Sequence, residues 1–307
     1  MKPHSWLPLF GSVNVEENSI TLVPVPPPPT TPAAPPTTPL ALVRSNVDFE
    51  QGDVEFDVFL PTSDSACQVV LNSGTHSELF AGLNVFAAPY GFAAFANAKW
   101  EPLQTTGQGS ALKAPAKYKL RVSVQGSSVD LSVNGVKVAT VTHQVVRAPL
   151  GILLQSSGAV SVSNFQIKAQ QSTAFVVMQF TDEYNSLFKD VIKPTCEEYR
   201  YKVIRADDFY TSGLILNDIT RSIRDSTLVI ADVTPDNANV FYELGYAHGI
   251  GKSTILLSDR KRERLPFDIS GFRTLFYDNT IGGKSAVEER LRRHLEALGA
   301  SQEKPPK

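Results

Sequence analysis

Thr227-Leu-Val-Ile-Ala-Asp-Val-Thr234 and, four residues later, Asn239-Val-Phe-Tyr-Glu-Leu-Gly-Tyr-Ala-His-Gly-Ile250 decide the fold of the second half of this chain. The first stretch begins with a continuous apolar run, as expected of a strand buried on both faces of a parallel sheet. The second stretch predicts a helix. A strand followed directly by a helix is one repeat of an α/β domain.

The same alternation continues on both sides of this repeat. Strands and helices are expected to alternate five times over residues 172–300, which predicts a doubly wound, five-stranded parallel sheet of the flavodoxin-like order 2-1-3-4-5. A polar tail, residues 301–307, is expected to be disordered. The other expected strands are Thr173–Met178, Tyr201–Ile204, Ser253–Leu257 and Arg273–Tyr277, and the other expected helices are Asp182–Tyr199, Ser212–Ile223 and Lys284–Leu298.

Residues 1–170 have the period of β-strands. Apolar and polar residues alternate in Gly52–Leu60, and Asn134-Gly135 lies between two such runs, which predicts a tight hairpin. Many short strands without helical periodicity predict an all-β sandwich or jelly roll. The other expected strands are Ser12–Leu22, Leu40–Val47, Lys119–Val124, Val129–Val133, Val136–Val141, Gly151–Gln155 and Val160–Ile167.

The charges of the chain nearly cancel: 29 basic and 31 acidic residues give a net charge of −2. This balance disfavours a protein that coats nucleic acid or an anionic membrane. Cys67 and Cys196 lie far apart, so no disulfide framework is indicated, and no apolar run has the length of a membrane helix. We therefore expect a cytoplasmic protein without a nucleic-acid or membrane partner. The histidines are scattered without metal-site spacing, so no metal is expected.

The predicted sheet locates a ligand site before any motif is considered. In doubly wound sheets, ligands bind beyond the carboxyl ends of the strands, where the order reverses between the first and third strands. Gln179 and Phe180 follow the first strand, Asp207 follows the second, and Asp232 ends the third. These four are candidate substrate-binding residues. Phe180 suits stacking on a base, and the alternative is a core residue that caps the strand.

Two features of the expected helices add candidates. Ser212 and Gly213 open a helix whose free backbone N–H groups suit a phosphate, although an ordinary N-cap has the same sequence. Glu243 lies near the start of the next helix, where the helix dipole also favours a glutamate. Its neighbours in Phe241–Ala247 are mostly apolar or small, and a charge in such surroundings is costly without a task or a partner. This favours a functional carboxylate.

The second half resembles the nucleoside 2-deoxyribosyltransferase-like superfamily, which is related in fold to Toll/interleukin-1 receptor (TIR) domains. The resemblance covers about Thr173 to Tyr277 and rests on Phe175-Val-Val-Met-Gln-Phe180, Val203-Ile-Arg-Ala-Asp-Asp208, Leu228-Val-Ile-Ala-Asp-Val-Thr234 and Asn239-Val-Phe-Tyr-Glu-Leu-Gly-Tyr-Ala-His-Gly-Ile-Gly-Lys252. The last of these blocks is the most specific.

The resemblance implies roles for individual residues. Glu243 matches the glutamate that attacks or stabilises the anomeric carbon of an N-glycosidic bond. Asp218 matches an acid that orients the base or the nucleophile, and an exposed helix residue is the equal alternative. In the transferases another acid lies six residues before the nucleophile, where this chain has Asn237. We place Asn237 and Asn239 among the substrate-binding residues.

The resemblance therefore implies an enzyme, an N-glycoside hydrolase or transferase acting on a nucleoside, a nucleotide or an NAD-like molecule. No cofactor is expected, and NAD enters as a candidate substrate. The alternative is a non-catalytic module that senses a nucleotide and signals through the first half, which Asn237 in place of an acid keeps open. We also expect a homo-oligomer.

The first half resembles the concanavalin-like sandwiches of the 3-keto-disaccharide hydrolase-like group, at Phe49–Asp57, Tyr90-Gly-Phe92, Trp100-Glu101 and the Val129–Val136 hairpin. The resemblance implies a recognition or assembly module with a protein or carbohydrate partner. Trp100, Tyr90 and Phe92 are candidates for a sugar platform, and packing within the sandwich is the favoured alternative.

Pro24–Pro39 holds 9 prolines in 16 residues, so this segment is unable to join a sheet as a regular strand. A ligand for an SH3-type domain is one interpretation. We favour a mobile surface loop between two strands, because composition alone specifies no partner.

Replacing Pro24–Pro39 by a short Gly-Ser linker is expected to shift the melting temperature by no more than about 2 °C, because loop closure entropy depends weakly on loop length. Thermal unfolding followed by circular dichroism measures the shift. A fall of many degrees would show that the segment packs against the rest of the protein.

Overall fold

The computed structural model describes residues 5–24, 38–108, 112–206, 215–280 and 282–298. The chain divides into two compact units. The first comprises Met1–Val124, Ser128–Val141 and Arg147–Ala169, and the second comprises Gln125–Ser127, Thr142–Val146 and Gln170–Lys307. Most of the Pro-rich segment and the polar tail lie outside the described residues.

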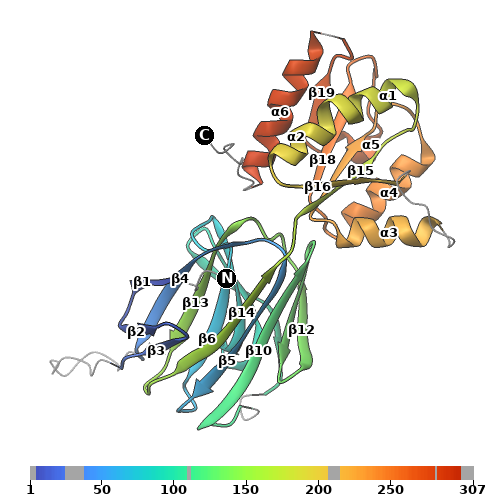
Figure 1. Ribbon diagram of the computed structural model, residues 1–307. Coiled ribbons are helices and arrows are strands. Elements are labelled where there is room, and N and C mark those ends of the chain that lie inside the picture. Colours follow the sequence, from blue (N-terminus) through green and yellow to red (C-terminus); the bar gives the residue numbers. More distant parts are fainter. Residues whose placement is uncertain (1–4, 25–37, 109–111, 207–214, 281, 299–307) are drawn as a thin grey trace, which may run out of the picture. The chain divides into compact units, whose positions relative to one another are not determined.

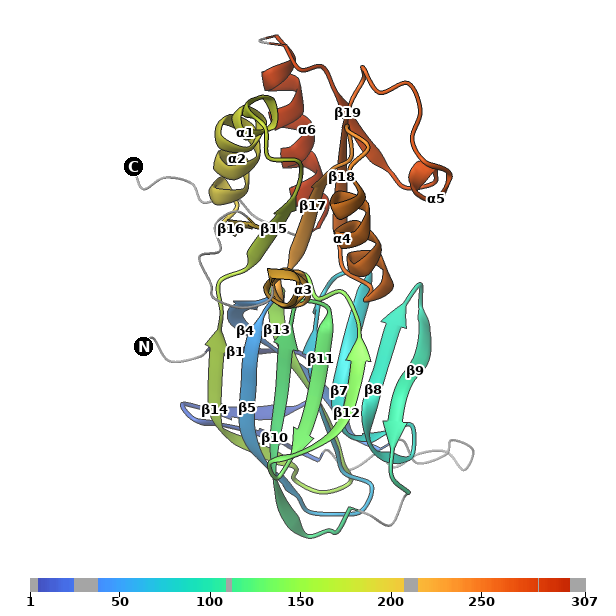
Figure 2. The same cartoon turned by 90° about the vertical axis from the view of Figure 1, so that its right-hand side faces the viewer.

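Two antiparallel sheets of seven strands each build the first unit, which confirms the predicted all-β sandwich (Figures 1 and 2). Their strand orders are β1-β4-β13-β6-β7-β8-β9 and β12-β11-β10-β5-β14-β3-β2. The strands are β1 (Trp6–Phe10), β2 (Val13–Glu16), β3 (Ser19–Leu22), β4 (Leu40–Phe49), β5 (Gly52–Leu60), β6 (Ala66–Leu71), β7 (Ser77–Val85), β8 (Ala88–Ala96), β9 (Lys99–Thr106), β10 (Ala116–Gln125), β11 (Ser128–Val133), β12 (Val136–Thr142), β13 (Ala148–Gln155) and β14 (Ser161–Ala169).

The strands with clear alternation lie where the sequence predicts them. In β5, every second residue from Val54 to Val58 points into the core, and Glu55 on the opposite face forms an ion pair of 2.9 Å with Lys119 of β10. The hairpin between β11 and β12 turns at Asn134 and Gly135, with φ angles of 51° and 79°. Positive φ at both positions is the geometry that an Asn-Gly turn supplies.

Two parts of the sandwich differ from the prediction. The expected single strand Ser12–Leu22 is a hairpin of β2 and β3, in which Glu16 pairs with Ser19. The strands β1 and β6 to β9 have no match among the expected strands. All six residues of β6 are buried, because the outer face of its sheet carries a second apolar cluster around Val70 and Phe80. A strand buried on both faces has no alternation to detect.

The aromatic residues considered as a sugar platform are split by this arrangement. Phe92 has no exposed surface, so it belongs to the core and is excluded from a platform. The Trp100 ring packs on Phe80 at 4.5 Å and on Phe95 at 5.1 Å between ring centroids, and 47% of Trp100 remains exposed. The favoured alternative, packing, therefore describes Phe92 fully and Trp100 in part.

A parallel five-stranded sheet of order β16-β15-β17-β18-β19 forms the centre of the second unit. Each of the five expected strands is present, with ends that differ by one or two residues. The strands are β15 (Thr173–Val177), β16 (Lys202–Arg205), β17 (Leu228–Asp232), β18 (Thr254–Asp259) and β19 (Thr274–Tyr277), and the helices are α1 (Asp182–Leu187), η2 (Phe188–Ile192), α2 (Lys193–Glu198), α3 (Ile215–Asp225), α4 (Ala238–Gly249), α5 (Phe267–Ser270) and α6 (Gly283–Ala297).

Helices cover both faces of this sheet. One core joins the sheet to α1, η2, α2 and α6, and the other joins it to α3, α4 and α5. Figure 2 shows α1, α2 and α6 on one side of the sheet and α4 and α5 on the other. Alternate residues of β15 enter the two cores, Ala174 and Val176 the first, Phe175 and Val177 the second. Burial on both faces explains the continuous apolar runs in the sequence.

The expected helix Asp182–Tyr199 is interrupted by the π-helical segment η2. Each π turn holds more residues than an α turn, and such segments occur often near functional sites. The wider turn lets Phe188, Val191 and Ile192 all face the core. Within the described residues, no helix combines the length and the apolar character needed to cross a bilayer.

Residues 170–307, expressed alone, are expected to fold and to melt in one cooperative transition. Both cores of the sheet are built from residues between Ala174 and Leu295, so the apolar burial that stabilises the sheet comes from this part of the chain. Circular dichroism and differential scanning calorimetry measure the transition. A product with helical signal but no cooperative melting would contradict the prediction.

Candidate active site

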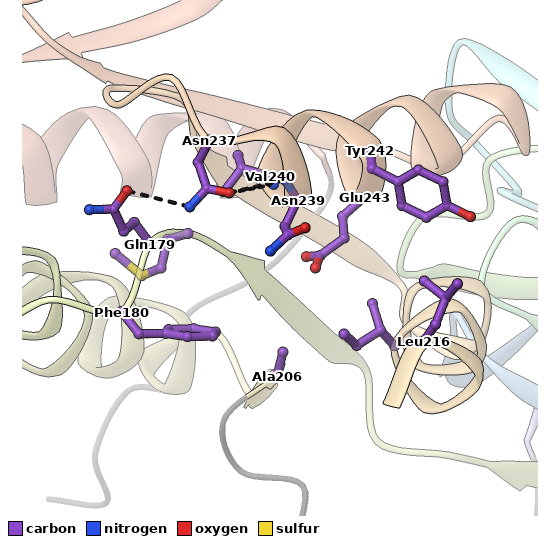
Figure 3. A pocket seen from close by; sticks show the side chains of 11 residues that line it. Gln179, Phe180, Ala206, Leu216, Asn237, Asn239, Val240, Tyr242 and Glu243 are labelled. Atoms are coloured by element: carbon purple, nitrogen blue, oxygen red, sulfur yellow. Dashed lines mark hydrogen bonds between the residues drawn. The ribbon is translucent and has the colours of Figure 1, made fainter. Parts of the chain in front are cut away.

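A cavity of about 520 Å³ lies at the carboxyl edge of the parallel sheet. Its walls come from the segments that directly follow β15 and β16, from the residue that caps α4, and from the helices α3 and α4 (Figure 3). The lining residues are Met178, Gln179, Phe180, Ala206, Leu216, Ile219, Asn237, Asn239, Val240, Tyr242 and Glu243.

Strand pairing brings these segments together. β15 lies between β16 and β17, with Val176 opposite Arg205 on one side and Val177 opposite Ala231 on the other. The chain therefore leaves three adjacent strands at the same edge. Because α1 and α4 cover opposite faces of the sheet, the segments after β15 and β17 diverge and leave room between them.

The loop from β17 to α4 is held by Arg262. Its guanidinium donates hydrogen bonds to the backbone oxygens of Val233 (2.9 Å) and Thr234 (2.8 Å) and forms an ion pair of 2.7 Å with Asp236. Two of these partners are backbone groups, so their geometry is set by the path of the loop itself. This positions Asn237, the next residue of the loop, at the start of α4.

Asn237 is the N-cap of α4. Its side-chain oxygen accepts hydrogen bonds from the backbone N–H groups of Asn239 (3.0 Å) and Val240 (3.5 Å), which satisfies donors that a helix start leaves open. Its amide nitrogen donates to Oε1 of Gln179, another lining residue, at 3.4 Å. Asn237 thus links the segments after β15 and β17.

Glu243 lies one turn further along α4, on the same helix face as Asn239, because residues four apart are neighbours on a helix. Figure 3 shows its carboxylate pointing from α4 into the cavity, towards Ala206. Burial raises the pKa of Glu243 from its ordinary 4.5 to about 7. Among the described residues, none donates a hydrogen bond to this carboxylate or forms an ion pair with it.

Asp232, the last residue of β17 and another acid of this edge, is placed differently. It is completely buried and does not line the cavity. Its carboxylate accepts hydrogen bonds from the backbone N–H of Thr234 (2.8 Å) and from the hydroxyl of Tyr277 (2.6 Å). Burial raises the pKa of Asp232, and these hydrogen bonds oppose the rise. The contacts of Asp232 tie β17 to β19.

Asp218 also lies outside the cavity lining. Its helix, α3, contributes Leu216 and Ile219 to the cavity, and Asp218 is half-buried on an adjoining part of the helix surface. Asp207, Ser212 and Gly213 lie outside the described residues.

The structure therefore brings together five of the candidate residues: Gln179, Phe180, Asn237, Asn239 and Glu243. Apart from Phe180, sequence reasoning missed the apolar and aromatic part of the lining. Helical spacing was the available signal, since Leu216 and Ile219 on α3 and Asn239 and Tyr242 on α4 are each three residues apart. Within the described ranges, no cluster of His, Cys, Asp and Glu side chains suits a metal ion.

No protein-family model and no curated protein sequence matches the chain. Among solved structures, the chain is similar to a carbohydrate binding module, CBM66, from Bacillus subtilis, at 11% identity and a TM-score of 0.41 over 52% of this chain and 92% of the module. It is also similar to a protein with a galectin-like fold from Bacillus subtilis (10% identity, TM-score 0.39, 53% and 88% covered) and to a β-glucanase from Bacillus licheniformis (14%, 0.36, 54% and 91%). These comparisons leave the expected resemblance of the second half untested.

Glu243→Gln is expected to stabilise the second unit more at pH 8 than at pH 5. The folded state raises the pKa of Glu243 to about 7, so folding disfavours its charged form as the pH rises from 4.5 through 7. With allowance for solvent at the cavity mouth, the neutral amide removes a penalty of about 1–2 kcal/mol at pH 8. Thermal melts of both proteins at the two pH values measure the difference.

Glu263→Gln is the matched control, because Glu263 is an exposed acid of the same unit. Equal shifts in melting temperature at pH 5 and pH 8 for Glu243→Gln would show that burial of this carboxylate carries no cost.

Proposed function

We propose that the second unit cleaves the N-glycosidic bond of a nucleoside, a nucleotide or an NAD-like molecule, with the Glu243 carboxylate acting at the anomeric carbon. One observation carries the proposal. Glu243 projects into a cavity of about 520 Å³ with a pKa raised to about 7, and no described residue pairs with its carboxylate. A buried carboxylate without a partner costs stability, and such groups are concentrated at functional sites.

The chemistry suits a carboxylate in this position. As the C1′–N bond breaks, its electron pair leaves with the base and positive charge develops on C1′ and the ring oxygen. A carboxylate oxygen beside C1′ stabilises this charge or forms a bond to C1′, giving a glycosyl ester. Water then attacks C1′ of the ester in a hydrolase, and a second base attacks in a transferase. In both cases Glu243 is released as a carboxylate.

The raised pKa supports the same role. A carboxylate removed from water is poorly stabilised before the reaction and strongly stabilised when a cation forms beside it. The interaction is therefore stronger in the transition state than in the ground state, which is the condition for faster chemistry.

The rest of the cavity suits the two halves of a nucleoside. Gln179 and Asn239 offer amide groups for sugar hydroxyls, while Phe180 and Ile219 offer an apolar wall for a base. Volumes of about 300–1,000 Å³ are usual for small-molecule sites. The position also supports the proposal, because sheets of the flavodoxin-like order bind ligands at this switch point.

Asn237 favours a second candidate function, the sensing of a nucleotide without turnover. The transferases have an acid at this position, and here its carboxamide caps α4 and binds Gln179 instead. Among the described lining residues, Glu243 is the sole acid. Because Glu243 acts at C1′ in its ionised form, a leaving base that needs a proton would have to obtain it from water.

Glu243→Gln is expected to lower the release of free base by a factor of at least about 1,000, because the amide keeps the shape but loses the charge that stabilises C1′. Chromatography of reactions with NAD, nucleotides and deoxynucleosides measures the free base. Asp218→Asn is expected to cost less than tenfold, since Asp218 lies outside the cavity lining.

The outcomes separate the two functions. Turnover by the wild type that survives Glu243→Gln contradicts the glycosidase. Binding of a nucleotide by the wild type without turnover of any substrate supports the sensor, and calorimetry with the same compounds detects it.

A further inference from the structure

Phe180 is an exposed aromatic ring in a cavity wall. It lines the cavity, and 49% of its surface is exposed. Figure 3 shows the ring at the end of the cavity beyond Ala206, across from the helix that carries Glu243. An isolated phenyl ring at the end of a loop has several rotamers, so an exposed ring that is to receive a ligand needs support from behind.

Arg205, the last residue of β16, supplies that support. Its guanidinium carbon lies over the Phe180 ring, 5.1 Å from the ring centroid. The side chain is almost completely buried, with 5% of its surface exposed, which is unusual for arginine. A guanidinium stacks well on an aromatic face and is strongly attracted to it when it is removed from water.

Arg205 is itself held by the helix that follows β15. Its Nη1 donates a hydrogen bond of 2.9 Å to Oδ1 of Asn185, and its guanidinium carbon lies 4.3 Å from the centroid of the Phe188 ring. Asn185 and Phe188 are three residues apart on one helix face. Phe188 is the first residue of the π-helical segment. The guanidinium therefore lies over two rings, and one of them faces the cavity.

We propose that Arg205 is a positioning residue for substrate binding: it holds the Phe180 ring as a platform on which the base of a nucleoside stacks. This inference rests on the proposed function for the identity of the ligand, and it adds a residue that does not line the cavity. Arg205 acts through Phe180 and contacts neither the base nor the bond that breaks.

Two other surface features, a small depression and an exposed aromatic patch, do not support a binding site. The small depression between α6 and the η2 segment, lined by Ser186, Asp190 and Lys284, has no second feature that points to a ligand. The partly exposed Trp100 patch on the sandwich has nothing that identifies what covers it.

The test measures binding, so that it is independent of turnover. Titration calorimetry is carried out with adenosine, 2′-deoxyadenosine, thymidine and NAD on the full chain carrying Glu243→Gln, which prevents consumption of the ligand. Phe180→Ala is expected to raise Kd by at least about tenfold, as loss of a stacking ring does. Arg205→Met is expected to raise Kd by about threefold to tenfold, because the ring loses its support.

The double variant distinguishes positioning from a general loss of structure. If Arg205 acts through Phe180, Arg205→Met has no further effect once Phe180→Ala is present, so the two changes are not additive. Arg292→Met is the matched control, because Arg292 pairs with Glu198 and does not line the cavity. Its Kd is expected to equal that of the parent. Phe188→Leu, which removes the second ring under Arg205, is expected to raise Kd by about twofold or more and serves if Arg205→Met does not fold.

Three results overturn the proposal. The first is that none of the four compounds binds, and the second is an unchanged Kd in Arg205→Met or in a folded Phe188→Leu. The third is a double variant whose change in Kd equals the product of the changes caused by Arg205→Met and Phe180→Ala alone. A different result would show that the proposed function is wrong: the wild type would bind one of the compounds without releasing free base.

Discussion

The position of β15 between β16 and β17 is the constraint on which the candidate active site depends. Parallel pairing brings the carboxyl ends of the three strands to one edge, and the helices after β15 and β17 depart to opposite faces. The segments that follow the strands therefore diverge, and the space between them is the cavity. Two contacts near the cavity join the segments that leave this edge: the hydrogen bond from Asn237 to Gln179 and the contact of Arg205 with the Phe180 ring.

Two acids of the second unit, Asp232 and Glu243, differ in how the protein compensates the burial of their carboxylates. Asp232 is the more deeply buried, yet it accepts hydrogen bonds from a backbone N–H and from the Tyr277 hydroxyl, so its burial is compensated. Glu243 is less buried and, among the described residues, has no such partner. A carboxylate that lacks protein partners but faces a cavity is available to a ligand. The two acids therefore differ in their hydrogen-bond partners as well as in their depth of burial.

In the sandwich, the sequence predicted strands that have one face in solvent and missed β6, which is buried on both faces. In the sandwich, β5 and β11 alternate cleanly because one face meets solvent, and both were predicted from period alone. β6 was missed because both of its faces are covered, and the resulting apolar run has no period. In the parallel sheet the same lack of period did not matter, because each strand is followed by a segment with helical spacing, and strand β17 was identified with its helix.

The sequence by itself determined the order of strands and helices in the second unit and the polar residue types near Glu243, because these depend on neighbours within a few positions. Tertiary structure alone decided which of them meet. It removed Asp232 and Asp218 from the cavity wall, added Tyr242 and Ala206, and placed the Arg205 guanidinium over the Phe180 ring. Those outcomes depend on strand order, helix rotation and burial, which arise from contacts between segments far apart in the chain, and a local pattern of residues does not contain them.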